Sequence, residues 1–275
     1  MAVDRGAPDR IGPVLEVIDK GRCSKAHPAP LLFVHGGSHA AWCWDEHFLD
    51  FFADKGYRVL APSLRGHGGS PISTRLQTCS IADYVEDVCS VADNLTATPV
   101  VIGHSMGGFI VQKYLETHNA PAGVLITSAP PRGHLGAQLR LIGRHPWRSV
   151  RSLIAGRTSI LFCTPELVRE SFFCAHTPES IVAHTTARIQ DESPRAIVLD
   201  MTFLNLVRFK DVTTPLLVLG AEDDGTYSHA YVRATAAAYH TEAEFFASMG
   251  HDMMLEDGWR AVADRVHTWL RTHGL

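Results

Sequence analysis

The feature that most constrains the fold is a series of short, continuous apolar segments separated by amphipathic ones. Segments of this kind occupy residues 31–34 (LLFV), 57–60 (YRVL), 99–102 (PVVI), 123–126 and 216–219. Continuous apolar runs of this length are typical of parallel strands, which are covered on both faces of their sheet. The alternation therefore predicts βαβ units and an α/β fold with a mostly parallel, doubly wound sheet.

The segments between the strands have the spacing of helices. One helical face is formed by Ile81, Tyr84, Val88 and Leu95, and Ser80 is placed to cap that helix. A similar pattern near the C-terminus includes Trp259, Val262, Val266 and Leu270. In such a fold the residues that follow each strand lie at the carboxyl edge of the sheet, where sites are placed.

The alternation stops between about residues 131 and 208. Within this stretch the sequence indicates helical segments at 135–142, 165–173, 178–190 and 194–206, and strand-like sequence resumes at Pro215. We therefore expect a helical cap inserted into an α/β core. The predicted boundaries are 1–131 and 209–275 for the core and 132–208 for the cap.

Composition excludes several classes of protein. The chain has 275 residues, 45% of them hydrophobic and 20% charged, with a formal charge of −4, so nothing indicates a nucleic-acid partner. Residues 1–13 lack the apolar segment of a signal peptide, and no apolar run is long enough to span a membrane. The six cysteines show no C-x-x-C spacing. We expect a cytoplasmic enzyme with free thiols and without a metal or cofactor.

The strongest chemical motif follows the strand at 99–102. Gly103-His104-Ser105-Met106-Gly107 has the pattern G-x-S-x-G, and a helical pattern comes directly after it. A sharp turn between strand and helix exposes the serine hydroxyl, and its crowded backbone requires small neighbours. This context predicts that Ser105 is a catalytic nucleophile.

A serine nucleophile needs two backbone N–H donors for the oxyanion that forms during acyl transfer. The residue after the nucleophile, Met106, is expected to supply one. The earlier strand ends in His35-Gly36-Gly37, and Gly37 is the best placed candidate for the other.

The serine also needs a histidine base and a carboxylate that orients it. After the cap, the strand at 216–219 leads to three successive carboxylates, Glu222, Asp223 and Asp224. His251 follows an extended stretch and precedes the last helix, which makes it the candidate base. Both aspartates remain candidates for the acid at this point.

Taken together, these motifs resemble those of the α/β-hydrolase superfamily. The matching blocks are HGG at 35–37, LRGHGGS at 64–70, GHSMGG at 103–108, GAEDD at 220–224 and GHDMMLED at 250–257. The resemblance implies an α/β-hydrolase fold with the cap after the sixth strand. It also implies that the acid lies three residues after the strand-ending Gly220, which favours Asp223 over Asp224.

The resemblance implies an esterase or lipase that acts on a small apolar ester through Ser105, His251 and Asp223. Residues 35–44 also resemble the plant methylesterase and hydroxynitrile lyase branch, so carbon–carbon bond cleavage is the alternative. Those lyases tend to have Thr at Gly36 and Lys at Asp252, and both differences favour the esterase. A non-catalytic receptor, and a cofactor-free peroxidase or oxygenase, are further alternatives on this fold.

The cap is expected to cover Ser105. Its apolar side chains are candidates for packing against the core or lining an acyl pocket: Leu135, Leu139, Leu141, Phe162, Phe172, Phe173, Phe203 and Leu204. Its first part is also basic, with Arg132, Arg140, Arg144, Arg148, Arg151 and Arg157. A solvated helix face explains these arginines most simply, and an acidic substrate group or anionic lipid is the alternative.

Overall fold

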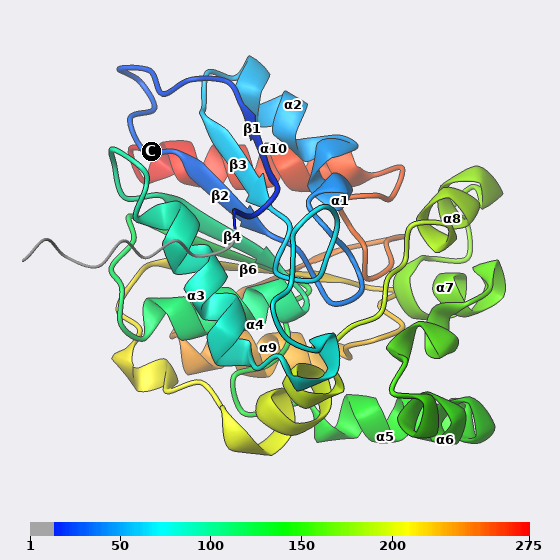
Figure 1. Cartoon of the computed structure of the whole chain (residues 1–275). Helices are drawn as coiled ribbons and strands as arrows, with labels where there is room; N and C mark the ends of the chain where they lie inside the picture. Colours follow the sequence, from blue (N-terminus) through cyan, green and yellow to red (C-terminus); the bar gives the residue numbers. More distant parts are fainter. Residues whose placement is uncertain (1–13) are drawn as a thin grey trace, which may run out of the picture.

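A computed structural model describes residues 14–275, and the segment 1–13, for which the sequence predicts no signal peptide, lies outside the described residues. A seven-stranded sheet with the order β1-β3-β2-β4-β5-β6-β7 forms the centre of the molecule (Figure 1). Its strands are β1 (Val17–Lys20), β2 (Leu31–Val34), β3 (Val59–Pro62), β4 (Val100–His104), β5 (Gly123–Ile126), β6 (Leu216–Ala221) and β7 (Ala243–Phe246).

All neighbouring strands pair in parallel except β1, which pairs with β3 in the antiparallel direction at the edge. Every residue of β2, β3, β4, β5 and β6 is buried, as expected for strands covered on both faces. The predicted doubly wound parallel sheet is therefore confirmed.

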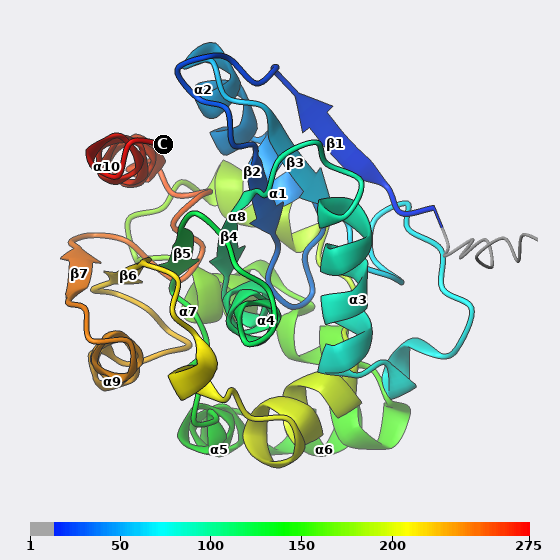
Figure 2. The same ribbon diagram turned by 90° about the vertical axis from the view of Figure 1, so that its left-hand side faces the viewer.

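Helices cover the sheet on both faces, as Figure 2 shows. α2 (Phe48–Asp54) and α10 (Trp259–Thr272) pack on one face with the short α1 (Trp42–Asp45), and their apolar residues form one core cluster. α3 (Ile81–Ala92), α4 (Met106–Leu115) and α9 (His229–Ala238) pack on the other face and form a second cluster.

The stretch between β5 and β6 contains helices and no strand. Its elements are α5 (Leu135–Arg144), α6 (Pro146–Ala155), η2 (Thr158–Phe162), α7 (Pro165–Phe172), α8 (Glu179–Thr186) and the π-helix η3 (Arg195–Leu204). The short turn η4 (Phe209–Asp211) ends this stretch just before β6, and a further short turn, η1 (Leu76–Thr78), precedes α3. In Figure 1 these helices lie along the lower and right-hand side of the sheet.

One expectation about this insertion was wrong. It follows the fifth strand of the described chain, not the sixth. The expected number came from the family resemblance, whereas residues 14–30 contribute only the single edge strand β1 before the parallel strands begin. Within residues 14–275, no helix has the length and apolar character needed to cross a lipid bilayer.

Candidate active site

Ser105 lies in the sharp turn between β4 and α4. Its backbone has φ 52° and ψ −118°, a conformation that residues other than glycine rarely adopt. The turn is fixed by hydrogen bonds from Ser105 N to the Ile126 carbonyl (3.1 Å) and from Ala129 N to the Ser105 carbonyl (3.1 Å). Strain held by surrounding structure is a recurring property of functional sites.

The glycines around Ser105 are required by close backbone approach. A Cβ atom on Gly103 would lie 2.4 Å from the Gly107 carbonyl oxygen, and one on Gly107 would lie 2.2 Å from the Val34 carbonyl oxygen. Any larger residue at Gly103 or Gly107 would collide with the backbone, so the tight turn between strand and helix requires glycine on both sides of Ser105.

His251 lies at the same edge of the sheet, after β7. Its Nδ1 donates a hydrogen bond of 2.9 Å to Oδ2 of Asp224, and both side chains are only 1% exposed. The other carboxylate oxygen, Oδ1, accepts the backbone N–H groups of Thr226 (2.7 Å) and Tyr227 (2.8 Å). The carboxylate therefore fixes the imidazole tautomer and leaves Nε2 able to accept a proton.

The preference for Asp223 over Asp224 was wrong as far as contact with His251 is concerned. Asp223 is exposed, and only its backbone N–H takes part in the loop, through a bond of 2.9 Å to the Met249 carbonyl. The next residue, Asp224, turns inward because its side chain closes an Asx turn onto the N–H of Thr226. The spacing typical of the family therefore indicates the residue directly before the one that contacts His251.

The two expected oxyanion donors lie beside Ser105. Gly37 and Met106 line the same pocket as Ser105 and His251. Met106 is the first residue of α4, so its N–H has no partner within the helix. Neither N–H group makes a hydrogen bond to residues 14–275. Both donors are therefore free to bind an anionic oxygen in the pocket.

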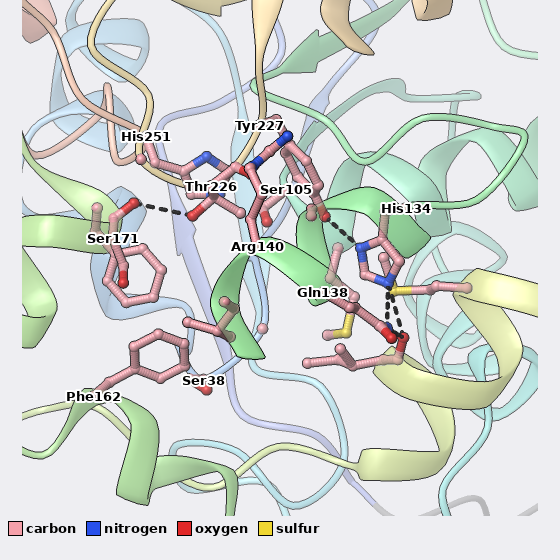
Figure 3. A pocket seen from close by; sticks show the side chains of 18 of the residues that line it. Ser38, Ser105, His134, Gln138, Arg140, Phe162, Ser171, Thr226, Tyr227 and His251 are labelled. Carbon is pink, nitrogen blue, oxygen red and sulfur yellow. Dashed lines mark hydrogen bonds between the residues drawn. The ribbon is translucent and has the colours of Figure 1, made fainter. Parts of the chain in front are cut away.

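The pocket between the sheet edge and the insertion has a volume of about 120 Å3 (Figure 3). Of the eight apolar side chains considered for an acyl pocket, Leu141, Phe162 and Phe172 line it. Phe173 is buried elsewhere, and the others are exposed: Leu135, Leu139, Phe203 and Leu204. Arg140 and Arg144 also line the pocket, and no carboxylate from residues 14–275 does.

Tyr227 is a residue of the site that sequence reasoning missed. Its buried phenol lies 2.9 Å from Nδ1 of His134, and the residue lines the pocket together with Ser105 (Figure 3). Burial raises the pKa of Tyr227 far above its usual value, so the phenol remains protonated. The only indication of this role in the sequence is that Tyr227 lies three residues after Asp224. At this short distance along the chain, a side chain can still lie close to His251.

Glu192 was also missed, because nothing in its local sequence distinguishes it. It is fully buried against the Gly37 turn, where its Oε2 accepts from Ser38 N at 3.4 Å. Tyr84 donates to its Oε1 at 2.5 Å, and His67 Nε2 lies 3.1 Å from its Oε2. Burial opposes its charge, but these partners outweigh burial and lower the pKa of Glu192. Through Glu192, the insertion thus helps to fix the Gly37 turn.

A buried charged pair lies behind His251. His39 donates from Nε2 to Asp252 Oδ2 (2.9 Å) and from Nδ1 to the Gly37 carbonyl (2.9 Å). Burial opposes protonation of His39, but Asp252 outweighs it and raises the His39 pKa; the same contact keeps the pKa of Asp252 low despite its burial. The pair connects the Gly37 turn to the residue next to His251.

One group of side chains within residues 14–275 has the spacing of metal ligands. Its members are His104, His251 and Asp252, whose ligand atoms lie within 4.8 Å of one another. Asp252 is already paired with His39, and His251 Nδ1 with Asp224. His104 donates from Nε2 to the His251 carbonyl (3.1 Å), and burial holds the His104 pKa well below its usual value. Each of the three side chains therefore already has a partner among the described residues.

The fold and site motifs agree with comparison to known proteins. Residues 31–265 match the model described as "Alpha/beta hydrolase family". The chain belongs to the α/β-hydrolase family. A thermophilic esterase from Thermogutta terrifontis has a similar structure, with a TM-score of 0.74 and 20% sequence identity over 95% of this chain and 94% of that one.

The curated relatives of this α/β hydrolase match over a shorter region. A non-heme chloroperoxidase from Burkholderia pyrrocinia is 37% identical over 108 residues, and a bifunctional esterase/perhydrolase from Acinetobacter calcoaceticus is 38% identical over 109 residues. Each match covers 37–38% of this chain and 38% of the relative. Plant methylesterases are also among the relatives.

Proposed function

We propose that this α/β hydrolase is a serine esterase that cleaves small, apolar carboxylic esters. The observation that carries the proposal is the hydrogen bond between Asp224 and His251, because His251 lines the same pocket as the strained Ser105. A nucleophile, a base and a group that orients the base are the parts that acyl transfer requires.

In the proposed mechanism, the Ser105 hydroxyl oxygen attacks the ester carbonyl carbon while His251 Nε2 takes the hydroxyl proton. The N–H groups of Gly37 and Met106 stabilise the oxyanion, each contributing about 3 kcal/mol to the transition state. The imidazolium then protonates the leaving alcohol, and Asp224 stabilises its charge. Water, activated by His251, attacks the acyl-enzyme and releases the acid and free Ser105.

The size and lining of the pocket support a small acyl group. Its volume of about 120 Å3 is close to that of a cavity that holds one benzene ring, about 150 Å3. Leu141, Phe162 and Phe172 make much of its wall apolar. We therefore expect turnover to be greatest for short or compact acyl groups and to fall for long, unbranched ones.

The alternative of hydroxynitrile lyase chemistry has less support. A Cβ atom on Gly36 would lie 2.7 Å from His104 Nδ1, so the threonine of the lyases would displace a buried side chain. Asp252 places a carboxylate paired with His39 where the lyases tend to have lysine. A negative charge there does not favour a cyanide anion.

The relatives favour one second activity on the same acyl-enzyme. The bifunctional esterase/perhydrolase suggests that hydrogen peroxide can take the place of water. Peroxide attack on the acyl-Ser105 ester would release a peracid and return the proton to the serine through His251. This step needs no group beyond those of the ester mechanism.

The test combines labelling of Ser105 with turnover. A fluorophosphonate should label Ser105 in the wild-type chain and leave Ser105→Ala unlabelled, as mapped by peptide mass spectrometry. Nitrophenyl esters from acetate to palmitate, with and without hydrogen peroxide, measure acyl preference and peracid formation. Labelling at another residue would contradict the nucleophile, and labelling without turnover of any ester would favour the receptor or lyase alternatives.

A further inference from the structure

Exposed apolar side chains are concentrated on one part of the molecule. Of the fourteen large hydrophobic residues exposed within residues 14–275, twelve lie between 135 and 206. The remaining two, Val14 and Val17, are near the start of the described chain. Scattered exposed apolar residues are ordinary, whereas a concentration on neighbouring helices marks an interaction surface.

α5 has an apolar outer side as well as a side that faces the pocket. Leu135, Leu139 and Ile142 are spaced at i, i+4 and i+7, which places them on one face, and each is about half exposed. On the inner side, Gln138 and Leu141 line the pocket beside Ser105. Because core packing accounts only for the inner side, the outer apolar residues require another partner.

α6 is more exposed still. Trp147 is 81% exposed, Leu153 77% and Ile154 81%, and Ser152 is the helix's one buried residue. α5 and α6 lie side by side at the lower edge of the molecule in Figures 1 and 2. We call the outer sides of these two helices the cap face.

The cap face belongs to the most basic part of the sequence. Residues 132–157 contain six arginines and no Asp or Glu, although the whole chain has a formal charge of −4. Arg144 and Arg157 are paired with Glu170 and Asp191. Within residues 14–275, Arg148 and Arg151 on α6 have no carboxylate partner, and Arg151 lies one helical turn from Trp147.

We propose that the cap face binds to the surface of a lipid bilayer that contains anionic lipids. Helices with exposed Trp, Leu and Ile beside arginine insert their apolar side chains at the headgroup level, and the arginines pair with lipid phosphates. A second copy of the chain is the less suitable partner. A two-fold contact through this face would place the arginines of one copy against those of the other.

The location of the cap face connects the surface to the pocket. Arg140 and Leu141 of α5 line the pocket, so only this helix would separate a bilayer on its outer side from the pocket that contains Ser105. An apolar ester dissolved in the bilayer would then be held close to the pocket. Binding to the bilayer does not rest on the proposed esterase activity, because it uses none of the candidate catalytic residues.

Flotation of the full chain with vesicles tests the proposal. We expect binding to vesicles of phosphatidylcholine mixed with phosphatidylglycerol, weaker binding in high salt, and little binding to phosphatidylcholine alone. The tryptophan fluorescence should shift to the blue with anionic vesicles, and Trp147→Phe should reduce that shift. Using Ser105→Ala in parallel separates the two proposals, since it should bind as the wild type does.

Substitutions on the cap face sharpen the test. The double variant Arg148→Gln/Arg151→Gln should bind anionic vesicles about 25-fold more weakly, at about fivefold for each arginine. The matched control is Arg260→Gln/Arg271→Gln on α10, at the opposite end of the molecule in Figure 1, which should bind normally. Trp147→Ser/Ile154→Ser should weaken binding at least about tenfold, with circular dichroism verifying the fold.

Three results would overturn the proposal. One is equal affinity for neutral and anionic vesicles, and another is unchanged binding in both cap-face double variants. The third is a wild-type dimer that binds no vesicles and becomes a monomer in Trp147→Ser/Ile154→Ser. That result would assign the cap face to a second copy of the chain.

Discussion

The sheet and the cap face differ in how their apolar residues are used. Every side chain of β2 and β4 is buried, whereas α5 contains no buried residue although its apolar spacing is equally regular. Periodicity therefore identifies which side of an element avoids water, but not what that side contacts. In the sheet the partner is the rest of the chain, and on the cap face it lies outside the described structure.

The sheet edge and the helical insertion contribute different kinds of residue to the candidate site. The sheet edge supplies Ser105, His251 and Asp224, whose positions follow from strand ends and tight turns. The insertion supplies Leu141 and Phe162, which define the space for a substrate. We therefore expect substitutions at the sheet edge to affect the chemical step and those in the insertion to affect substrate preference.

The largest effect should come from the two neighbouring aspartates of the loop after β6. Asp224→Asn keeps the shape of the side chain but no longer fixes the His251 tautomer, so kcat should fall about 10⁴-fold. Asp223→Asn, on an exposed side chain, should change kcat by less than about threefold. Steady-state ester kinetics decide between them, and a larger loss in Asp223→Asn would restore the residue that the family spacing favoured.

A matched pair of tryptophans compares the core with the cap face directly. Trp44 is fully buried and packs with Phe33 at a ring-centroid distance of 5.1 Å, whereas Trp147 is 81% exposed. Trp44→Ala should lower the free energy of unfolding by about 3–5 kcal/mol. Trp147→Ala should change it by less than about 0.5 kcal/mol. Urea denaturation in the absence of lipid measures both, and a large loss in Trp147→Ala would mean that α6 packs more closely than its exposure indicates.

The sequence was most informative where chemistry and geometry depend on short segments. The strands at 31–34 and 123–126 have the predicted bounds, and Ser80 caps α3 as expected. The elbow at Ser105 and the position of His251 after the last strand were also predicted. In each of these cases a few consecutive residues determine the local structure.

Features that depend on distant contacts could not be predicted. The choice between Asp223 and Asp224 depends on an Asx turn closed by Thr226, and Glu192 becomes important only because the insertion folds back onto the Gly37 turn. α6 was not predicted either. The edge strand β1 was missed because half its residues are exposed.

The buried pair of His39 and Asp252 should make stability depend on pH. The lowered pKa of Asp252 means that its contribution is present above its unfolded-state pKa, about 3.9, and is lost as pH falls through its folded-state pKa. The raised pKa of His39 means that its contribution is complete below about pH 6.5 and is lost as pH rises through its folded-state pKa. The pair should therefore stabilise the chain most between about pH 4 and 6.5.

Asp252→Asn should cost about 3 kcal/mol of unfolding free energy near pH 6, and the difference from wild type should shrink at higher pH. The control is the partly exposed pair of His145 and Glu170 in the insertion, 2.8 Å apart. Glu170→Gln should cost less than about 1 kcal/mol. Urea midpoints from pH 5 to 9 measure both variants. A difference for Asp252→Asn that is constant across this range would show that His39 does not titrate with the pair.

The smallest effect should come from helix capping, where two serines occupy the same position on different helices. Ser80 precedes α3, accepts a hydrogen bond of 3.1 Å from Asp83 N and forms a capping box with the Asp83 carboxylate. Ser228 precedes α9 and makes no such bond. Ser80→Ala should therefore cost about 1 kcal/mol of unfolding free energy and Ser228→Ala only a few tenths. Equal losses, measured by urea denaturation, would mean that the capping bond adds nothing beyond the backbone preference of serine. α5 on the cap face also begins without a side-chain cap. If the capping bond adds no stability, its presence in α3 and its absence from α5 would not make the two helices differ in stability.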